Sequence, residues 1–314
     1  MTRRTDPKAT TKLRRSRTSA RSDCDVAAKG SDVGPGEAAV SAWDRDLNAA
    51  ALRWELPTLC LLAWLAFAAI PLAEGGIGLS WDALNHHIYL GWVAQTPRFE
   101  RDFLAASYQG YQFPYLYWPV YQLAVNGWSG AWAGVALATL HLAAVPPVWM
   151  IARTCMVGKT PFDLTMRWLA VAMAFMTGVV LSLFDSTSND LMAATPLVWA
   201  LALALVPADT GRPAWLTPRR AALLSGLLAG AAIGCKLSNA PLALVLPVLW
   251  LMSANADLKT RLVHTTAACL ATVPGYLLVY GYWGSLLWGQ FGNPIYPFYD
   301  VYFAPVRALT GWTP

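Results

Sequence analysis

Long uncharged apolar runs, separated by short polar connections, make up most of the chain. A helix needs about 20 mostly apolar residues to cross the hydrocarbon core of a membrane. The runs that fit or approach this length cover 56–73, 131–152, 168–184, 191–207, 221–235, 237–254 and about 265–288. The pattern predicts an all-α, polytopic membrane bundle of about seven transmembrane helices, with interfacial helices in a first outer loop over 74–130.

One further apolar stretch is too short to be a membrane-spanning helix. The segment "YLYWPVYQLAVNGW" at 115–128 is rich in Tyr and Trp, side chains that concentrate where a membrane meets water. A helix of this length and content is typical of a segment that lies in the interface. We therefore expect 115–128 to lie flat on the outer face.

The positive charges support this topology. With the N-terminus inside and 115–128 lying flat, 19 of the 23 Lys and Arg residues fall on the inner side, and only Arg98, Arg101, Lys236 and Arg307 fall outside. Short cytoplasmic loops carry such an excess of Lys and Arg. If 115–128 crossed the membrane, every later loop would change side and the bias in the short loops would reverse. The sequence thus predicts a multi-pass protein with a cytoplasmic N-terminus.

The composition separates a basic N-terminal tail from the apolar remainder of the chain. Only 13% of the residues are charged, well below the roughly 25% of soluble domains. Residues 1–29 hold nine Lys and Arg among small polar residues, a composition that cannot build a core. We expect a disordered basic cytoplasmic tail over 1–50 and a transmembrane domain over 51–314. The basic residues indicate contact with anionic lipid and no nucleic-acid partner, and the five cysteines lack a metal-type spacing.

The densest polar cluster follows the first span, in "SWDALNHHIYLGW" at 80–92. In a helix that starts near Asp82, the side chains of Asp82, His86 and Tyr89 share one face. A carboxylate in a partly dry cleft is suited to act as a general base. Two other interpretations stay open: Asp82 caps the helix, or Asp82 and His86 bind a divalent metal. We expect His87 to face the lipid headgroups.

Two further outer segments carry candidate residues. Asp190 ends the loop "FDSTSND", where Ser186 or Ser188 is suited to cap the next helix with Asp190 in its first turn. The functional interpretation places Asp190 beside Asp82 across a cleft. Lys236 lies between two apolar runs, where an ionisable group usually marks function or a partner. It either binds a lipid-linked phosphate as a point charge or extends its ammonium to the interface.

The order of these segments resembles one family. "WDALNHHIYLGW", "STSNDLM", "GLLAGAAIGCKLSNAPLAL" and the terminal "GNPIYPFYD" are similar to motifs of the GT-C superfamily of membrane glycosyltransferases, especially the glycosyltransferase 87 and aminoarabinose transferase-like groups of bacteria. The resemblance covers roughly 50–303. Because the family usually has more spans, the resemblance implies a member shortened at its C-terminus, a fragment or a non-catalytic relative.

The resemblance implies a function. It is the inverting transfer of a sugar from a polyprenyl-phosphate donor at the outer, periplasmic face of the bacterial inner membrane. The implied catalytic residues are Asp82 as the base, Asp190, and His86 in the place of a second carboxylate. The expected substrate-binding residues are Lys236, Arg101, Tyr89 and Asn293. The presence of His86 leaves a divalent metal as an open alternative to metal-free catalysis.

Two other classes of function compete with this one. A lipid or solute transporter needs polar groups near the membrane midplane and repeated halves, and the sequence shows no repeat. A non-catalytic membrane subunit of a cell-envelope polysaccharide system would need a membrane protein partner. Transport by the purified protein would favour the first class, and co-purification with a partner would favour the second.

Overall fold

The computed structural model describes residues 41–102, 107–208, 212–252 and 256–313, which are helical with connecting turns and contain no strand. The prediction of an all-α fold is therefore confirmed. The chain divides into residues 1–40 and 41–314. Most of the predicted tail lies outside the described residues. Within the described residues, a short helical turn covers Ala42–Asp44 and α1 begins at Ala49.

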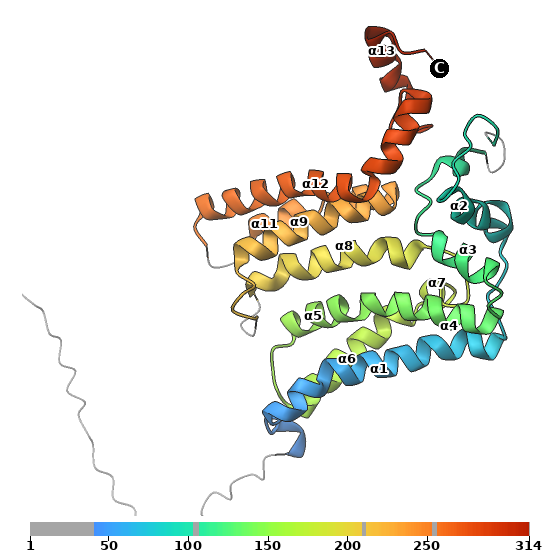
Figure 1. The fold of residues 1–314 in the computed structure, drawn as a ribbon. Coiled ribbons are helices and arrows are strands. Elements are labelled where there is room, and N and C mark those ends of the chain that lie inside the picture. The colour runs from blue at the N-terminus through green and yellow to red at the C-terminus, as the bar shows by residue number, and fades with distance from the viewer. Residues whose placement is uncertain (1–40, 103–106, 209–211, 253–255, 314) are drawn as a thin grey trace, which may run out of the picture. The chain divides into compact units, whose positions relative to one another are not determined.

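Four helical segments are long and apolar enough to cross a membrane. They are α1 (Ala49–Glu74), Gly130–Cys155, Asp190–Ala208 and α12 (Leu258–Phe291). The second consists of α4 (Gly130–His141) and α5 (Val145–Cys155), and the third begins with α8 (Asp190–Leu205). Figure 1 shows these segments lying side by side in one layer. They correspond to four of the seven predicted spans and support a membrane protein.

The other three predicted spans are shorter or broken helices. The run 168–184 splits into α6 (Pro161–Phe175) and α7 (Gly178–Leu181), and 237–254 becomes a turn, α10 (Ala240–Ala243) and α11 (Leu246–Met252). Two prolines within 237–252 interrupt helical hydrogen bonding, because proline has no backbone N–H. The remaining run forms α9 (Pro218–Cys235). The count of seven crossings is not confirmed.

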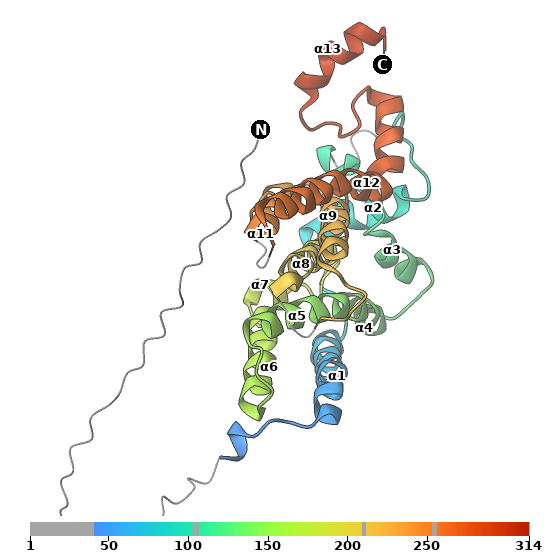
Figure 2. The same ribbon diagram turned by 90° about the vertical axis from the view of Figure 1, so that its left-hand side faces the viewer.

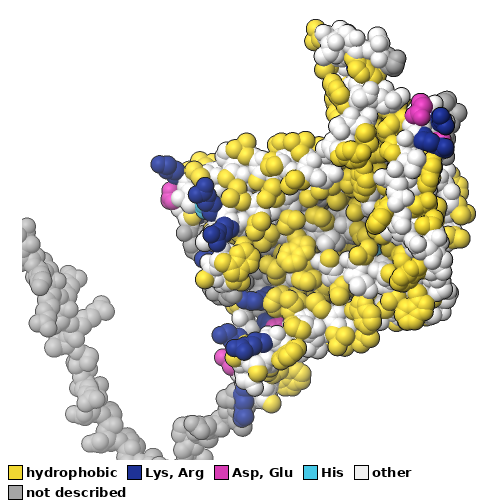
Figure 3. Space-filling model, in the orientation of Figure 1, with side chains coloured by type: hydrophobic (Ala, Val, Ile, Leu, Met, Phe, Trp, Pro, Cys, Tyr) yellow, Lys and Arg dark blue, Asp and Glu magenta, His cyan; other side chains and the backbone are white. Residues whose placement is uncertain are grey.

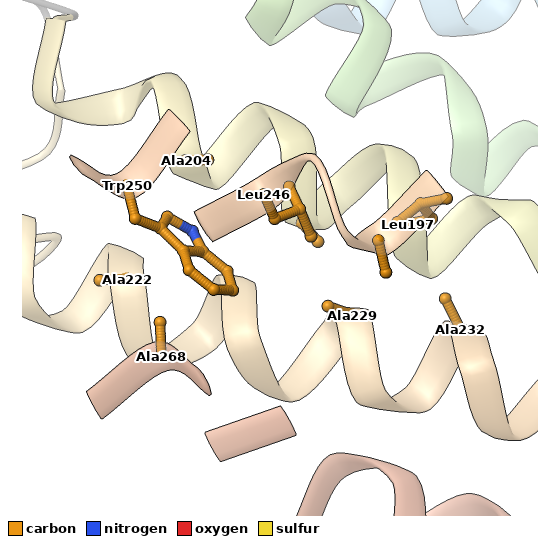
Figure 4. Close-up of a cluster of buried hydrophobic side chains, with 10 residues drawn as sticks. Leu197, Ala204, Ala222, Ala229, Ala232, Leu246, Trp250 and Ala268 are labelled. Carbon is orange, nitrogen blue, oxygen red and sulfur yellow. The ribbon is translucent and has the colours of Figure 1, made fainter. Parts of the chain in front are cut away.

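The helices α9 and α12 pack with their backbones in close contact. A Cβ atom added to Gly230 would lie 2.0 Å from the carbonyl oxygen of Thr272, and one added to Gly275 would lie 2.0 Å from that of Leu227. Such small residues let membrane helices approach closely. Next to this contact, Trp250 of α11 fills the space between α8, α9 and α12 (Figure 4). Its indole N–H donates to Ser225 Oγ at 3.0 Å.

A buried ion pair joins the helices α1, α5 and α6. Arg167 on α6 donates to both carboxylate oxygens of Glu55 on α1, at 2.6 and 2.9 Å. Trp149 on α5 donates to the same carboxylate at 2.9 Å. The carbonyls of Met156 and Gly158 accept the remaining guanidinium bonds. Every charged group of this pair is therefore satisfied by the protein, and a single substitution would leave a buried charge alone.

Positive side chains gather at one end of the helices. Figure 3 shows Lys and Arg side chains along the edge of the molecule where α1 and α12 begin, and apolar side chains over the surface between this edge and the opposite one. A broad uncharged surface of this kind matches the hydrocarbon core of a membrane.

Three short helices lie at the opposite end of the layer. They are α2 (Ile88–Val93), α3 (Trp118–Val125) and α13 (Asp300–Thr310), and Figure 2 shows α13 apart from the other helices. At eight residues, α3 is too short to cross a membrane. This agrees with the expectation that 115–128 does not span.

Candidate functional site

The connection that follows α1 and the connection that precedes α8 meet through their backbones. Gly78 and Ser186 form an isolated parallel bridge, in which the N–H of Gly78 donates to the carbonyl of Asp185. A Cβ at Gly78 would lie 3.3 Å from that carbonyl oxygen, so a larger residue would press on the contact. The bridge brings the segment before Asp82 next to the segment before Asp190.

Asp82 does not cap its helix. The N–H of Ala83 donates to Ser80 Oγ at 3.1 Å, and the Asp82 carboxylate makes no capping bond. The capping interpretation of Asp82 is therefore wrong, because Ser80 already satisfies this end of the helix. The Asp82 side chain is 53% exposed, and its Oδ1 lies 3.8 Å from Nδ1 of His86. This leaves an accessible carboxylate beside an imidazole.

A widened, π-helical turn over Ala83–His87 buries both histidines. The prediction that His87 faces the lipid headgroups is wrong, because its side chain is buried. Such a turn holds one more residue than an α-helical turn, so neighbouring side chains both face the protein. Nδ1 of His87 lies 2.7 Å from Thr187 Oγ1, and the imidazole stacks on the ring of Tyr117 at 4.6 Å. The histidines thus tie the first outer loop to the second.

Asp190 and Lys236 form an ion pair between the start of α8 and the end of α9. Ser188 Oγ accepts from the N–H of Asp190 and donates to its Oδ2 at 2.7 Å. The N-cap residue of α8 is Asn189, not Ser186 or Ser188, and its side chain makes no capping bond. Lys236 has an extended backbone. The turn that follows it is held by Asn239, whose amide donates to the carbonyls of Ala193 and Ala232 at 2.9 and 2.8 Å.

Tyr117 links the two halves of this cluster. Tyr117 is only 2% exposed. Burial raises the pKa of Tyr117, and the charges of Asp190 and Asp82 raise it further. The phenol is therefore a neutral hydroxyl on which the charges of two carboxylates act. Tyr117 and Asn189 were not predicted as site residues, although Tyr117 lies in the aromatic segment 115–128 and Asn189 directly precedes Asp190.

The structure brings four predicted site residues into one electrostatic neighbourhood. The charges of Asp82, Lys236 and Asp190 all act on His87, which adjoins His86. These residues come from two outer loops and the break after α9. The grouping is decided by contacts between loops that are distant in the sequence.

A cavity of about 800 Å³ begins at this cluster and extends between the helices. Asn189 and Lys236 line one end of it. The walls are mostly apolar and come from α9, α10, α11 and α12, and they include Ile233, Leu244, Pro247 and Trp250. Aromatic residues of the first outer loop and of the terminal turn, such as Phe113 and Phe298, complete the lining. The arrangement joins a long apolar space to a polar, charged end.

Three predicted substrate-binding residues have other surroundings. Arg101 is exposed and lies 3.8 Å from Glu100. Tyr89 packs near Val93 and Trp92, because the widened turn rotates it away from the face of Asp82. Asn293 is fully buried in the terminal turn. Its amide donates to the carbonyl of Phe298 and to Asp300 Oδ1, both at 3.1 Å, and its oxygen accepts from the N–H of Ile295.

The described residues contain no group of three or more His, Cys, Asp or Glu side chains arranged to bind a metal ion. Two buried polar atoms next to the cluster, His86 Nδ1 and Asn189 Oδ1, lack a hydrogen-bond partner.

Comparisons with protein-family models, with curated proteins and with solved structures found no match to this chain.

The buried His87 should make stability depend on pH. Burial lowers the pKa of His87 from 6.5 to about 4, and its neighbour His86 lowers it as well. As the pH falls from 6.5 toward 4, the unfolded chain binds a proton that the folded chain does not, so the free energy of unfolding falls. A shift of this size corresponds to at most about 3 kcal/mol.

Thermal unfolding of the purified protein between pH 7.5 and 4 measures this effect. We expect His87→Gln to reduce the slope, and His264→Gln, at the inner end of α12, to leave it unchanged. Equal slopes for the wild type and His87→Gln would contradict the interpretation.

Proposed function

We propose that this protein is a membrane glycosyltransferase that moves a sugar from a polyprenyl-phosphate donor to an acceptor hydroxyl at the outer face, with Asp82 as the general base. The observation that supports it is the cavity of about 800 Å³, which is apolar along its walls and ends at Lys236 beside the acidic cluster. A lipid that carries a phosphate at one end has matching chemistry.

The proposal includes a topology. We infer seven crossings of a bacterial inner membrane, with the N-terminus in the cytoplasm and Asp82, Asp190 and Lys236 at the periplasmic side. The gathering of Lys and Arg at the opposite end of the helices supports this orientation. The three shorter segments, α6 with α7, α9, and 237–252, pack against the long helices and would supply the remaining crossings.

The dimensions of the cavity suit one lipid chain. Its lining on α12 runs from Cys269 to Tyr280, a rise of about 17 Å along the helix, which is roughly half of the 30 Å hydrocarbon core. The chain of the donor would lie along α10 and α11, and its phosphate would lie at the Lys236 ammonium. The sugar would then extend toward Asp82 and His86.

The reaction follows from this placement. Asp82 accepts the proton of the acceptor hydroxyl. The oxygen of that hydroxyl forms a bond to the anomeric carbon from the face opposite the phosphate. The bond between that carbon and the phosphate oxygen breaks, polyprenyl phosphate leaves, and the configuration inverts. Lys236 stabilises the negative charge on the leaving phosphate. Neutral His86 beside Asp82 leaves the carboxylate free to accept the proton.

Binding of undecaprenyl phosphate to the protein in nanodiscs tests the donor site. We expect Lys236→Met to weaken this binding by about tenfold or more, because a charge-assisted hydrogen bond contributes about 1.5–3 kcal/mol. Lys259→Met removes an exposed charge at the opposite end of α12 and should leave binding unchanged. Equal affinity for the wild type and Lys236→Met would contradict the proposed phosphate position.

The same cavity also favours a second candidate, a carrier that moves lipid between leaflets. The two functions differ in their need for a base. In proteoliposomes, a carrier with Asp82→Asn would move labelled polyprenyl phosphate between leaflets as well as the wild type does. A transferase would release polyprenyl phosphate from a labelled polyprenyl-phosphate sugar only with Asp82 intact.

A further inference from the structure

The ammonium of Lys236 already has a partner inside the protein. It pairs with Oδ1 of Asp190, while Oδ2 of Asp190 accepts a hydrogen bond from Ser188. The Lys236 side chain is 34% exposed and that of Asp190 is 53% exposed. The pair therefore lies at the surface of the cluster, where an incoming ligand can reach it.

An anion that binds Lys236 must compete with this carboxylate. Two negative groups at one ammonium repel each other, and the repulsion grows as water is excluded by a bound lipid. A phosphate at Lys236 thus favours an arrangement in which Asp190 moves away.

A hydrogen-bond donor is available to the displaced carboxylate. The charge of Asp190 acts on the phenol of Tyr117, and a neutral phenol O–H is a hydrogen-bond donor. The ring is held in place by its stack on His87 and by α2. A Cβ added to Gly91 would lie 2.6 Å from the carbonyl oxygen of Tyr117, so the two backbones pack closely.

We propose that Asp190 is an internal competitor for the anion site at Lys236, and that binding of the donor phosphate releases Asp190 toward Tyr117. This inference rests on the proposed function, in which the phosphate belongs to a polyprenyl donor. The released carboxylate faces the acceptor region near Asp82 and accepts a hydrogen bond from an acceptor hydroxyl. Donor binding therefore precedes productive acceptor binding.

The affinity of undecaprenyl phosphate for Asp190→Asn in nanodiscs tests the competition. Because a partly exposed ion pair contributes little net free energy, we expect binding to become about three- to fivefold tighter. Asp190→Ser removes the same charge and should have the same effect. Asp185→Asn changes a neighbouring acid that is not paired with Lys236, and it should leave the affinity for undecaprenyl phosphate unchanged. None of these variants should change the affinity for uncharged undecaprenol.

Two results separate failure of this inference from failure of the proposed function. If the wild type binds the phosphate but Asp190→Asn and Asp190→Ser bind it equally or more weakly, Asp190 is not a competitor and the inference is overturned. If neither the wild type nor the variants bind it, the donor site itself is absent. In a Lys236→Met background, Asp190→Asn should no longer tighten binding, because the ammonium for which the two anions compete is gone.

Discussion

Asp82→Asn is expected to lower the rate of sugar transfer by about 10²–10⁴-fold, the range that a positioned general base contributes. The asparagine amide keeps the size of the side chain but cannot accept a proton. Folding should be preserved, because the carboxylate is half exposed and Ser80 supplies the capping bond at this helix end. The measurement is the release of polyprenyl phosphate from a panel of labelled polyprenyl-phosphate sugars by purified protein.

The matched control is Glu100→Gln. Glu100 is another exposed carboxylate of the first outer loop, near Arg101 and not in the cluster. It should retain full transfer and the same thermal unfolding temperature as the wild type. Transfer at the wild-type rate by Asp82→Asn would remove Asp82 from the role of the base. Binding of undecaprenyl phosphate should be nearly unchanged in both variants, since neither alters Lys236.

Arg167→Met is expected to lower the free energy of unfolding by about 3–5 kcal/mol, because it leaves the buried Glu55 carboxylate without its cation. Both side chains are only 3% exposed, so water cannot replace the lost partner. The carbonyls of Met156 and Gly158 would also lose their donor. Unfolding of the purified protein in mild detergent, followed by its tryptophan fluorescence, measures the change.

Two further variants separate the lost pair from general effects of the substitution. Arg219→Met removes an exposed charge at the same end of the helices and should change stability by less than about 0.5 kcal/mol. The double variant Glu55→Leu with Arg167→Met removes both charges and should recover most of the loss, since an apolar pair of similar volume often replaces a buried ion pair without destabilisation. Wild-type stability in Arg167→Met would show that the pair is not what holds α1, α5 and α6 together.

Much of the fold could be predicted because membrane insertion depends on local composition. The runs that became α1, α8 and α12 are apolar for about the length of a membrane, and this property belongs to each segment by itself. The split of 168–184 was harder to predict. There, α6 ends at Phe175 and the Thr177 side chain caps α7, although the run remains apolar throughout.

The candidate site was predicted in part. Asp82, His86, Asp190 and Lys236 were selected because charged or titratable residues at the ends of apolar runs are unusual, and the structure brings them together. Tyr89 was selected because it would share a helix face with Asp82, and Asn293 because it is a polar residue of the terminal segment; both lie elsewhere. A one-dimensional pattern marks unusual residues but does not show in which direction a side chain points after an irregular turn.

The sequence by itself determined the helical class, the membrane setting and the end of the helices that carries the polar residues, since all three follow from how apolar and charged residues alternate along the chain. Only the tertiary structure decided that Asp190 pairs with Lys236 and that Glu55 is buried with Arg167. These contacts join residues 46 to 112 positions apart. They depend on how closely the helices and loops pack, which the glycines of α9 and α12 and the widened turn before α2 control.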